Sequence, residues 1–521
     1  MKKLLKSCLA VALVFITAFS FVGCGTKLSA TTVDTSKVKS VNGVSTNGGM
    51  TAIYDGYLYF INGTKTNDGK SVKKNTKSAI CKVAYNEATG ETSGDVEVVV
   101  DGLVGFEDGS IRFYGDFMYY AVPCSDKNYK GDVLYNKTTF MRYDLVNKKS
   151  YELYTTELNS ADEKVSYAYY VVDNTLNLVV YEASNKTITS LKIDKKVVEN
   201  YKIINVTGCV MSENNGTVVT PSATVDANSY VFYTKSPEQY ESVQSGSKVF
   251  RTSAVKDNSY LLSTGYTVTL DSIMAGKLIT TMNDKVYIHE IKGSTTEALK
   301  FEENCISYAV YTNAIFLEDY AIEYTTGAEP VAQLVKKAGN VCVLYISNET
   351  FYFMIMDWTS GNELPAEKVS QLHDVKDVLL HGIAFVEEEI EEDVVEEPEG
   401  EEPEGEEPTE EPTEEPAAEP KKRTVMFAVY SVEKVMYKIE IAEVVDATTG
   451  TLEISHWTNP VQLSSTKTVA DNGLLVPEII GEYLFILAED KDKNVYMHKI
   501  SLSNKESVSK EATKVWLEEK K

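Results

Sequence analysis

The residue with the clearest chemical potential is Cys24, which follows a short apolar segment at the start of the chain. The first six residues contain three lysines, the apolar run covers residues 9–22, and Gly23 stands directly before the cysteine. A basic start followed by a short apolar run and a small residue is the pattern of a secretory signal peptide. The run is too short to span a bilayer comfortably as a helix of the mature protein.

The residues around Cys24 resemble the lipobox of bacterial lipoproteins, in which a small residue precedes a cysteine that is lipidated and becomes the new N-terminus. Phe21 departs from that pattern, because the family usually has Leu there. The resemblance implies a lipoprotein signal peptide over residues 1–23 and an extracytoplasmic protein anchored to the bacterial cell membrane through lipid on Cys24. Two or more acyl chains would supply a stable anchor. An ordinary signal peptide that happens to contain a cysteine is the alternative.

Residues 24–50 are small and polar, which predicts a flexible tether between the membrane and the fold. The remaining cysteines are odd in number, and no pair has C-x-x-C spacing, so a disulfide framework or a metal site is not indicated. They are Cys81, Cys124, Cys209, Cys305 and Cys342. Two of them, Cys81 and Cys342, lie in apolar runs typical of strands, where a buried and inert thiol is expected.

Other residue types that could support catalysis form no recognised set. The five histidines are scattered, and Ser-x-x-Lys at 36–39 and 71–74 lacks its companion motifs. The segment "DKDKN" at 490–494 resembles the start of a calcium loop but lacks the required glycine. Tyrosines such as Tyr119, Tyr120 and Tyr233 could line a ligand surface or simply pack. The sequence therefore predicts no catalytic, metal-binding or cofactor-binding residue and favours a protein that is not an enzyme.

The charge of the chain is concentrated in one place. The formal net charge is −26, and 19 acidic residues lie between Glu387 and Glu419, so the rest of the chain carries −26 + 19 = −7. Dense like charge with regularly spaced proline predicts a disordered insertion over residues 387–423. The basic residues 421–423 close this segment and are expected to pair with its glutamates. No basic stripe exists elsewhere, which argues against nucleic acid as a partner.

The elements that would position these residues are strands. Eight short aromatic or β-branched runs recur at a spacing near 55 residues once the insertion is removed, which is typical of a propeller. They begin at Tyr57, Phe117, Leu176, Tyr230, Val286, Val341, Ile383 and Tyr483. Downstream hairpin patterns such as "AICKVAYNEATGE" and "TFMRYDLVNKKSYEL" follow several of these runs. We therefore expect blades whose second strand is the aromatic run, with the acidic insertion in the loop that follows this strand in the seventh unit.

The repeats resemble those of an uncharacterised group of bacterial surface lipoproteins with β-propeller-type repeats. The resemblance rests on the Gly-Asp-aromatic entry and the "YKI"-like strand, and it implies fold and location without a substrate. The prediction is an all-β fold with a single propeller over residues 51–516, of about eight, alternatively seven, four-stranded blades. The sixth unit departs from the pattern with helix-like segments at "EPVAQLVKKAG" and "LPAEKVSQLHD".

Two functional classes follow from these patterns. The preferred class is a non-enzymatic binding or scaffold module, since a propeller presents many loops on a rigid disc. Its partner would be a protein, peptide or glycan, in addition to the membrane that holds its lipid. The alternative class is a surface enzyme that acts on glycan or peptide through carboxylates meeting at the propeller channel, because such carboxylates need no local motif.

Overall fold

A computed structural model gives the structure of the chain over the following residues. It describes 26–27, 50–61, 79–87, 89–100, 111–127, 133–156, 165–172, 175–194, 197–211, 230–235, 248–253, 256–263, 268–274, 277–290, 299, 306–307, 313–347, 350–356, 367–371, 378–389, 422–456, 458–468, 477–489 and 495–515. The regular elements in these ranges are strands, which form seven sheets. Within the same ranges, no helix has the length and apolarity needed to cross a bilayer.

The first three sheets in chain order are named A, B and C. Sheet A contains β2 (Thr51–Tyr54), β3 (Tyr57–Ile61), β4 (Ile80–Asn86) and β5 (Glu91–Val100). Sheet B contains β6 (Arg112–Tyr114), β7 (Phe117–Lys127), β8 (Val133–Asp144) and β9 (Lys149–Thr155), with β1 (Thr26–Lys27) added in parallel to β9. Sheet C contains β10 (Ser166–Val172), β11 (Thr175–Glu182), β12 (Thr187–Ile193) and β13 (Val197–Ile204).

Two further sheets of four strands follow. Sheet D contains β14 (Val206–Met211), β15 (Tyr230–Lys235), β16 (Lys248–Ser253) and β17 (Lys256–Ser263). Sheet E contains β18 (Thr269–Met274), β19 (Lys277–Met282), β20 (Lys285–Glu290) and β21 (Ile306–Ser307).

The C-terminal part of the chain forms the largest and the last sheet. Sheet F contains β22 (Ala314–Tyr324), β23 (Ala332–Ser347), β24 (Thr350–Met356), β25 (Glu367–Gln371), β26 (Val378–Glu389), β27 (Lys422–Val432), β28 (Val435–Asp446), β29 (Thr451–Ile454) and β30 (Val461–Lys467). Sheet G contains β31 (Glu478–Ile480), β32 (Tyr483–Glu489), β33 (Val495–Ser501) and β34 (Thr513–Lys514).

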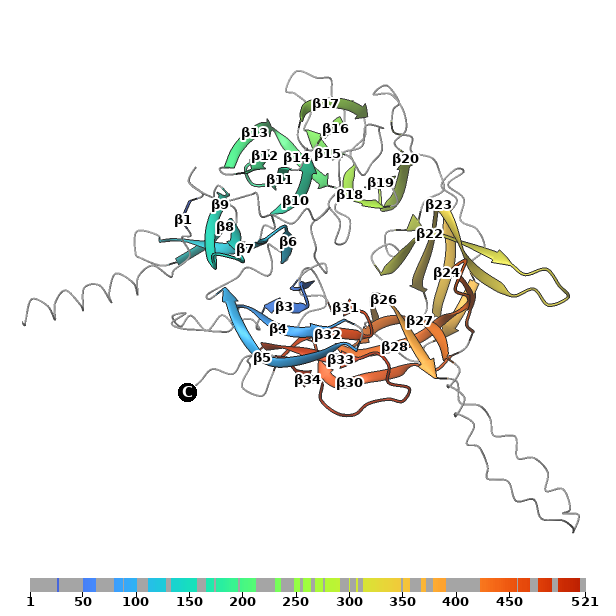
Figure 1. Ribbon diagram of the computed structural model, residues 1–521. Helices are drawn as coiled ribbons and strands as arrows, with labels where there is room; N and C mark the ends of the chain where they lie inside the picture. The colour runs from blue at the N-terminus through green and yellow to red at the C-terminus, as the bar shows by residue number, and fades with distance from the viewer. Residues whose placement is uncertain are drawn as a thin grey trace, which may run out of the picture.

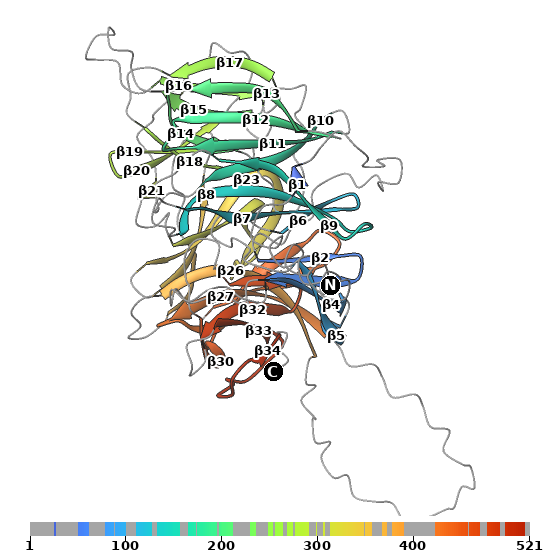
Figure 2. The same cartoon turned by 90° about the vertical axis from the view of Figure 1, so that its left-hand side faces the viewer.

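The sheets follow one another around a ring, which makes the fold all-β and propeller-type (Figure 1). Seen edge-on, their strands run along the ring axis (Figure 2). Buried apolar clusters connect each sheet to the next around the ring, and three of them illustrate this. One packs Phe140 of sheet B with Tyr169 of sheet C, another packs Val429 of sheet F with Leu484 of sheet G, and a third joins sheet G to sheets A and B.

Strand sequences reflect this stacking. In β11, "TLNLVVYE", every residue after the first is buried, because sheets B and D cover both faces of sheet C. A strand covered on both faces reads as a continuous apolar run instead of an alternating one. Tight turns complete the hairpins: Asp55 and Gly56 have φ of 51° and 75°, the left-handed values of a type I′ turn.

The predicted blade count is not what the described residues show. Five sheets have four strands, sheet B has five and sheet F has nine, whereas the prediction was eight or seven separate four-stranded blades. The sixth and seventh units are merged, because the 16-residue strand β23 pairs with β22 and β24 and also with β29. The prediction of helices in the sixth unit is wrong, since the first segment contains the start of β23 and the second contains all of β25.

The hairpin predictions are better matched. The segment "AICKVAYNEATGE" forms β4 and the start of β5, and "TFMRYDLVNKKSYEL" forms β8 and β9. The place of the aromatic run varies, however: it is the second strand in sheet A but the third in sheet E, as β20. In the seventh unit the run lies in β26, so the insertion connects the first and second strands of that unit and not its second and third.

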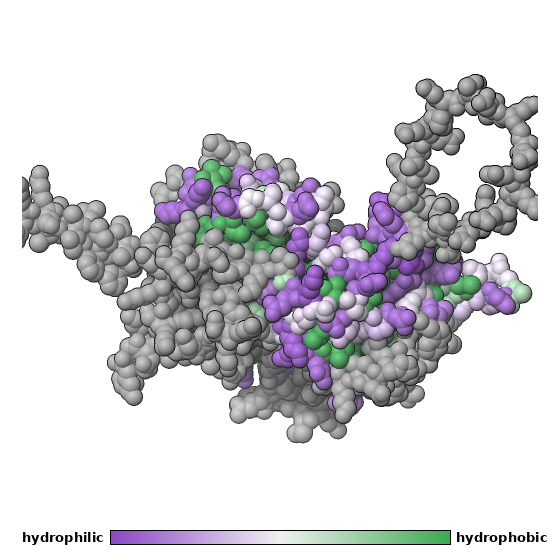
Figure 3. Space-filling model, turned by 90° about the horizontal axis from the view of Figure 1, so that it is seen from below, coloured by the Kyte–Doolittle hydropathy of each residue, from purple (hydrophilic) through white to green (hydrophobic). Residues whose placement is uncertain are grey.

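Seen from below, the described surface is mostly hydrophilic, with apolar patches between the polar residues (Figure 3). The large apolar side chains that are exposed come from different sheets. They are Val98, Val146, Val198, Ile204, Tyr324, Phe385 and Val445. Single exposed apolar residues of this kind are normal for a protein surface.

Candidate functional site

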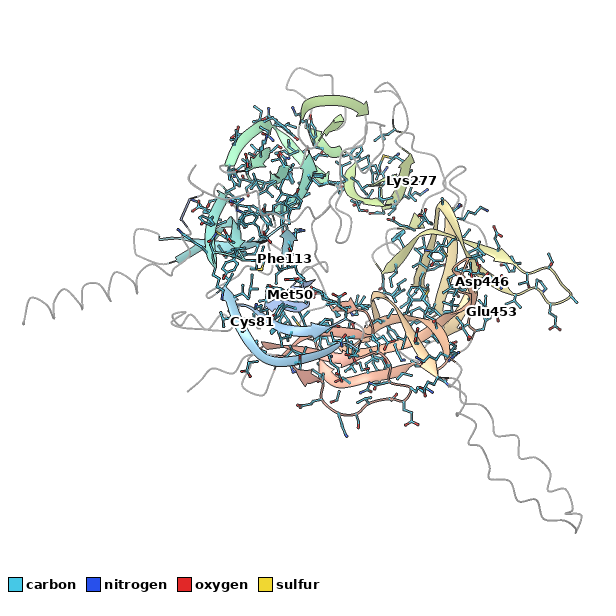
Figure 4. All side chains as sticks on the ribbon, in the orientation of Figure 1. Met50, Cys81, Phe113, Lys277, Asp446 and Glu453 are labelled. Carbon is cyan, nitrogen blue, oxygen red and sulfur yellow. The ribbon has the colours of Figure 1, made fainter. Side chains whose placement is uncertain are left out.

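The predicted lipidation site, Cys24, lies outside the described residues, together with the whole predicted signal peptide. The predicted tether is described only near its two ends. Thr26 pairs with Tyr151 of β9, and Met50 is buried beside sheet A, so these parts of the tether contact the ring. Figure 4 shows Met50 and Phe113 close together at the inner edges of sheets A and B.

The two thiols expected in strands pack as the sequence predicted, and one imidazole is buried as well. Cys81 and Cys342 are fully buried, and neither forms a disulfide bond. His289 is buried on β20, and its Nε2 lies 2.8 Å from Thr280 Oγ1. In the part of the chain that the structure describes, no three His, Cys, Asp or Glu side chains are grouped to hold a metal ion. The "DKDKN" segment lies outside that part.

The tyrosines that the sequence singled out are core residues. Tyr119, Tyr120 and Tyr233 are exposed by only 2%, 3% and 1%. Tyr119 packs between sheets B and C, and its ring centroid lies 5.4 Å from that of Tyr169. Burial raises the pKa of Tyr120 to about 12, although Ser150 opposes the shift by hydrogen bonding to the phenol. None of these three rings lines an open surface.

The acidic insertion begins and ends in neighbouring strands. Strands β26 and β27 are antiparallel partners, with Glu389 opposite Lys422 and Val386 opposite Val425. The prediction placed residues 387–389 and 422–423 inside the disordered insertion, but they are paired strand. Residues 390–421 lie outside the described part of the chain. The insertion therefore leaves and re-enters one sheet at adjacent positions.

A cluster of charged residues fixes the base of this hairpin, and we call it the neck. Arg423 on β27 donates to Glu388 at 2.9 Å, to Glu440 at 3.2 Å and to Glu443 at 3.0 Å. Burial works against the charge of Arg423, but the surrounding carboxylates outweigh it and raise the pKa of the guanidinium. One planar guanidinium thus connects three strands, β26, β27 and β28.

A buried lysine continues the neck into the next sheet. Lys438 on β28 is 1% exposed, and its Nζ donates to the carbonyl of Leu502 at 2.7 Å. The same Nζ lies 3.7 Å from Glu388 Oε1 and 3.8 Å from the ring centroid of Phe427. Burial lowers the pKa of the Lys438 ammonium, and Glu388 opposes that shift. In addition, Lys505 donates to the carbonyl of Glu389 at 3.0 Å. The neck is therefore fixed to both sheet F and sheet G.

The ring closes where sheet G meets sheet A, which we call the A–G junction. No strand crosses it among the described residues, so side chains make the polar contacts. The carboxylate of Glu478 accepts hydrogen bonds from Met50 N and Thr51 Oγ1. Burial raises the pKa of Glu478 to about 7, although these donors favour the charged form. Tyr483 donates to the carbonyl of Thr89 at 3.0 Å.

The sequence predicted some contacts of the neck and none of the A–G junction. Residues 421–423 were expected to pair with nearby glutamates, and Lys422 and Arg423 do so. Glu440 and Glu443 were missed, because they stand 17 and more residues further on and only strand pairing brings them to Arg423. Glu478 was also missed. Nothing in "PEII" distinguishes a buried carboxylate from an exposed one.

The sequence matches no protein-family model and no curated protein sequence at a significant level. Among solved structures, it is similar to the β-propeller domain of the Trilobed protease from Pyrococcus furiosus, at 7% identity and a TM-score of 0.33, covering 75% of this chain and 93% of that one. The WD40 domain of SCAP from fission yeast matches at 9% identity and a TM-score of 0.36, covering 91% and 97%. The periplasmic gluconolactonase of Pseudomonas aeruginosa matches at 10% identity and a TM-score of 0.32, covering 86% of this chain and 99% of that one. Similarities this distant carry no argument about activity.

Proposed function

We propose that the protein is a lipid-anchored, extracytoplasmic protein of a bacterial cell that acts as a non-enzymatic binding or scaffold module. The observation that supports this function is the neck, which holds both ends of the acidic insertion in neighbouring strands of the ring. A rigid scaffold that carries a long charged segment is suited to presenting that segment to a partner.

The acidic insertion supplies a dense negative charge for such a partner. Residues 390–421 contain 16 Asp and Glu residues and one Lys. The neck itself uses Glu388, Glu440 and Glu443 to neutralise Arg423. A dense negative charge outside the neck attracts cations and basic segments, and this attraction weakens as salt is added. We therefore propose a basic protein or peptide as the partner, bound weakly and in a salt-sensitive way.

Two buried carboxylates have structural partners. Glu388 is 9% exposed, binds Arg423 and lies close to Lys438. Glu478 accepts hydrogen bonds from Met50 N and Thr51 Oγ1. The enzyme alternative needs carboxylates that converge on a substrate. These described acids instead hold strands and sheets together, which supports the scaffold proposal.

The anchoring part of the proposal is tested at Cys24. Replacing Cys24 with Ala should move the protein from the membrane fraction to the medium or periplasm and abolish incorporation of labelled fatty acid. Cys8→Ala is the matched control, because Cys8 lies within the predicted signal peptide and should be removed with it. Retention of the Cys24→Ala protein in the membrane would contradict the lipid anchor.

The binding part is tested with a fluorescent oligolysine peptide as the probe. The full chain should bind it at low salt, and most of the binding should disappear in 0.5 M NaCl because the charges are then screened within about a few ångströms. A variant with Gln in place of every Glu in residues 396–415 keeps the length of the insertion and should lose this binding. Equal binding by the wild type and this variant would refute the proposed role of the insertion.

A further inference from the structure

Two arginines lie in one cross-strand row of sheet B. Pairing places Arg112 of β6 opposite Tyr119 of β7, Tyr119 opposite Arg142 of β8, and Arg142 opposite Tyr151 of β9. Directly opposed residues of antiparallel strands point to the same face of the sheet. The row therefore alternates arginine and tyrosine from the inner strand to the outer one.

This face of sheet B packs against sheet C, and we call the contact the B–C interface (Figure 1). Arg112 Nη1 donates to Tyr167 OH at 2.7 Å, and the guanidinium carbon lies 4.8 Å from the centroid of the same ring. The guanidinium carbon of Arg142 lies 4.4 Å from the ring centroid of Phe117. Both guanidinium groups therefore sit among aromatic rings at an interface between two sheets.

Arg142 is the less satisfied of the two. The residue is 3% exposed, and its Nη1 donates to the carbonyl of Asp194 at 3.4 Å. Its Nε and Nη2 are fully buried and have no hydrogen-bond partner. No ion pair of Arg142 occurs among the residues that the structure describes. One whole edge of the guanidinium thus lacks an acceptor.

The one acidic residue of β8 is already committed. Asp144, two residues further along β8, accepts hydrogen bonds from Val146 N at 2.9 Å and from Asn147 N and Nδ2 at 2.8 Å each. Tyr119, directly opposite Arg142, cannot supply charge, because burial raises the pKa of its phenol to about 12, even though the charge of Arg142 and a hydrogen bond with its side chain oppose the shift. Neither Asp144 nor Tyr119 therefore balances the positive charge of Arg142.

A buried arginine cannot relieve this imbalance by losing its proton, because the guanidinium stays charged at all ordinary pH values. Burying an ion without a counter-ion is strongly unfavourable. The cation–π contact with Phe117 compensates only part of the lost hydration. An external anion that accepts from Nε and Nη2 would supply both the missing charge and the missing acceptors.

We propose that the Nε and Nη2 edge of Arg142 binds the carboxylate of a small organic anion at the B–C interface. Nε–H and Nη2–H are parallel donors, and their spacing matches the two oxygens of a carboxylate. A single carboxylate carries one negative charge, which balances the one guanidinium.

The strand ends indicate the side from which such an anion enters. Phe117 begins β7, Asp144 ends β8, and Asp194 follows the last residue of β12. These positions lie at the turns on one face of the ring, and Arg142 is two residues from the end of its strand. The carboxylate would therefore approach from this face, while any larger part of the ligand stays nearer the solvent.

The test uses the full chain in detergent, with sodium acetate as the probe and sodium chloride at equal ionic strength as the control. Acetate should raise the melting temperature of the wild type more than chloride does, and the carboxyl ¹³C signal of labelled acetate should shift on binding. Arg142→Met removes the charge and should abolish both effects. This variant should also melt higher than the wild type without acetate, because it no longer buries an unbalanced charge.

Arg142→Lys keeps the charge but loses the two parallel donors, so its affinity for acetate should fall at least tenfold. This variant keeps the test decisive if Arg142→Met fails to fold. Sodium phosphate forms a separate arm of the experiment. Stabilisation by phosphate without any by acetate would overturn the carboxylate assignment. Acetate binding that is unchanged in either Arg142 variant would overturn the site itself.

Discussion

Two junctions of the ring connect neighbouring units through different kinds of contact. Within sheet F, β23 and β29 join the sixth and seventh units through paired backbones, with Gln333 opposite Glu453 and Leu334 opposite Leu452. The A–G junction has no such pairing among the described residues and depends on side chains, including the buried carboxylate of Glu478. A backbone pairing does not titrate, whereas a carboxylate does. The comparison predicts that pH and side-chain substitutions act mainly on the A–G junction.

The largest effect is expected at Gly90, where sheet A meets Tyr483. Gly90 has a φ of 64°, and a Cβ there would lie 1.6 Å from Tyr483 Cε2. Overpacking and the left-handed backbone together should cost about 4 kcal/mol for Gly90→Ala, measured by urea unfolding. Gly94→Ala is the matched control: its φ is 76°, but a Cβ there would meet nothing within 4 Å, so the cost should be about 1 to 2 kcal/mol.

A second variant tests whether the clash at Gly90 is with the ring of Tyr483. Tyr483→Ala removes the ring that a new Cβ would meet, so Gly90→Ala should cost about as much as Gly94→Ala in that background. Equal costs for the two glycines in the wild-type background would show that Tyr483 does not pack on Gly90, and that the A–G junction is looser than described.

The next effect is the pH dependence of the same junction. The folded pKa of Glu478 is raised from 4.5 to about 7, so the folded state holds this proton more tightly than the unfolded state. The resulting stability is fully present below about pH 4.5 and is lost as pH rises to about 7, by roughly 3 kcal/mol. Glu478→Gln should remove this loss. The difference in free energy of unfolding between the variant and the wild type should therefore grow between pH 4.5 and 7. A difference that is constant with pH would contradict a titrating Glu478.

The smallest effect is expected in sheet F, where the insertion joins two paired strands. Replacing residues 391–420 with a short glycine-containing turn keeps Glu389 and Lys422 in the ladder. Stability should change by no more than about 2 kcal/mol, the loop-closure difference between thirty residues and a few. Proteolysis within the insertion should leave both parts of the chain associated. Separation of the two parts without denaturant would show that the insertion connects independent domains.

The sequence predicted local features better than distant ones. The aromatic runs, the turns and the return of the chain after the acidic segment depend on neighbouring residues, so they could be predicted. The merging of two units through β23 and β29 could not, because Leu334 and Leu452 are far apart in the sequence and their pairing leaves no local pattern. The row of Arg112, Tyr119 and Arg142 was hidden for the same reason, since register alone brings it together.

The neck also determines how the protein would respond to mechanical force. A partner that pulls on the insertion pulls β26 and β27 apart from the same end, so their hydrogen bonds carry the load one after another and not all at once. Arg423 and Glu388 form the second pair from that end, and their ion pair is among the first contacts to be strained. Because Arg423 also holds Glu440 and Glu443 on β28, part of the force passes sideways into the third strand before the hairpin opens.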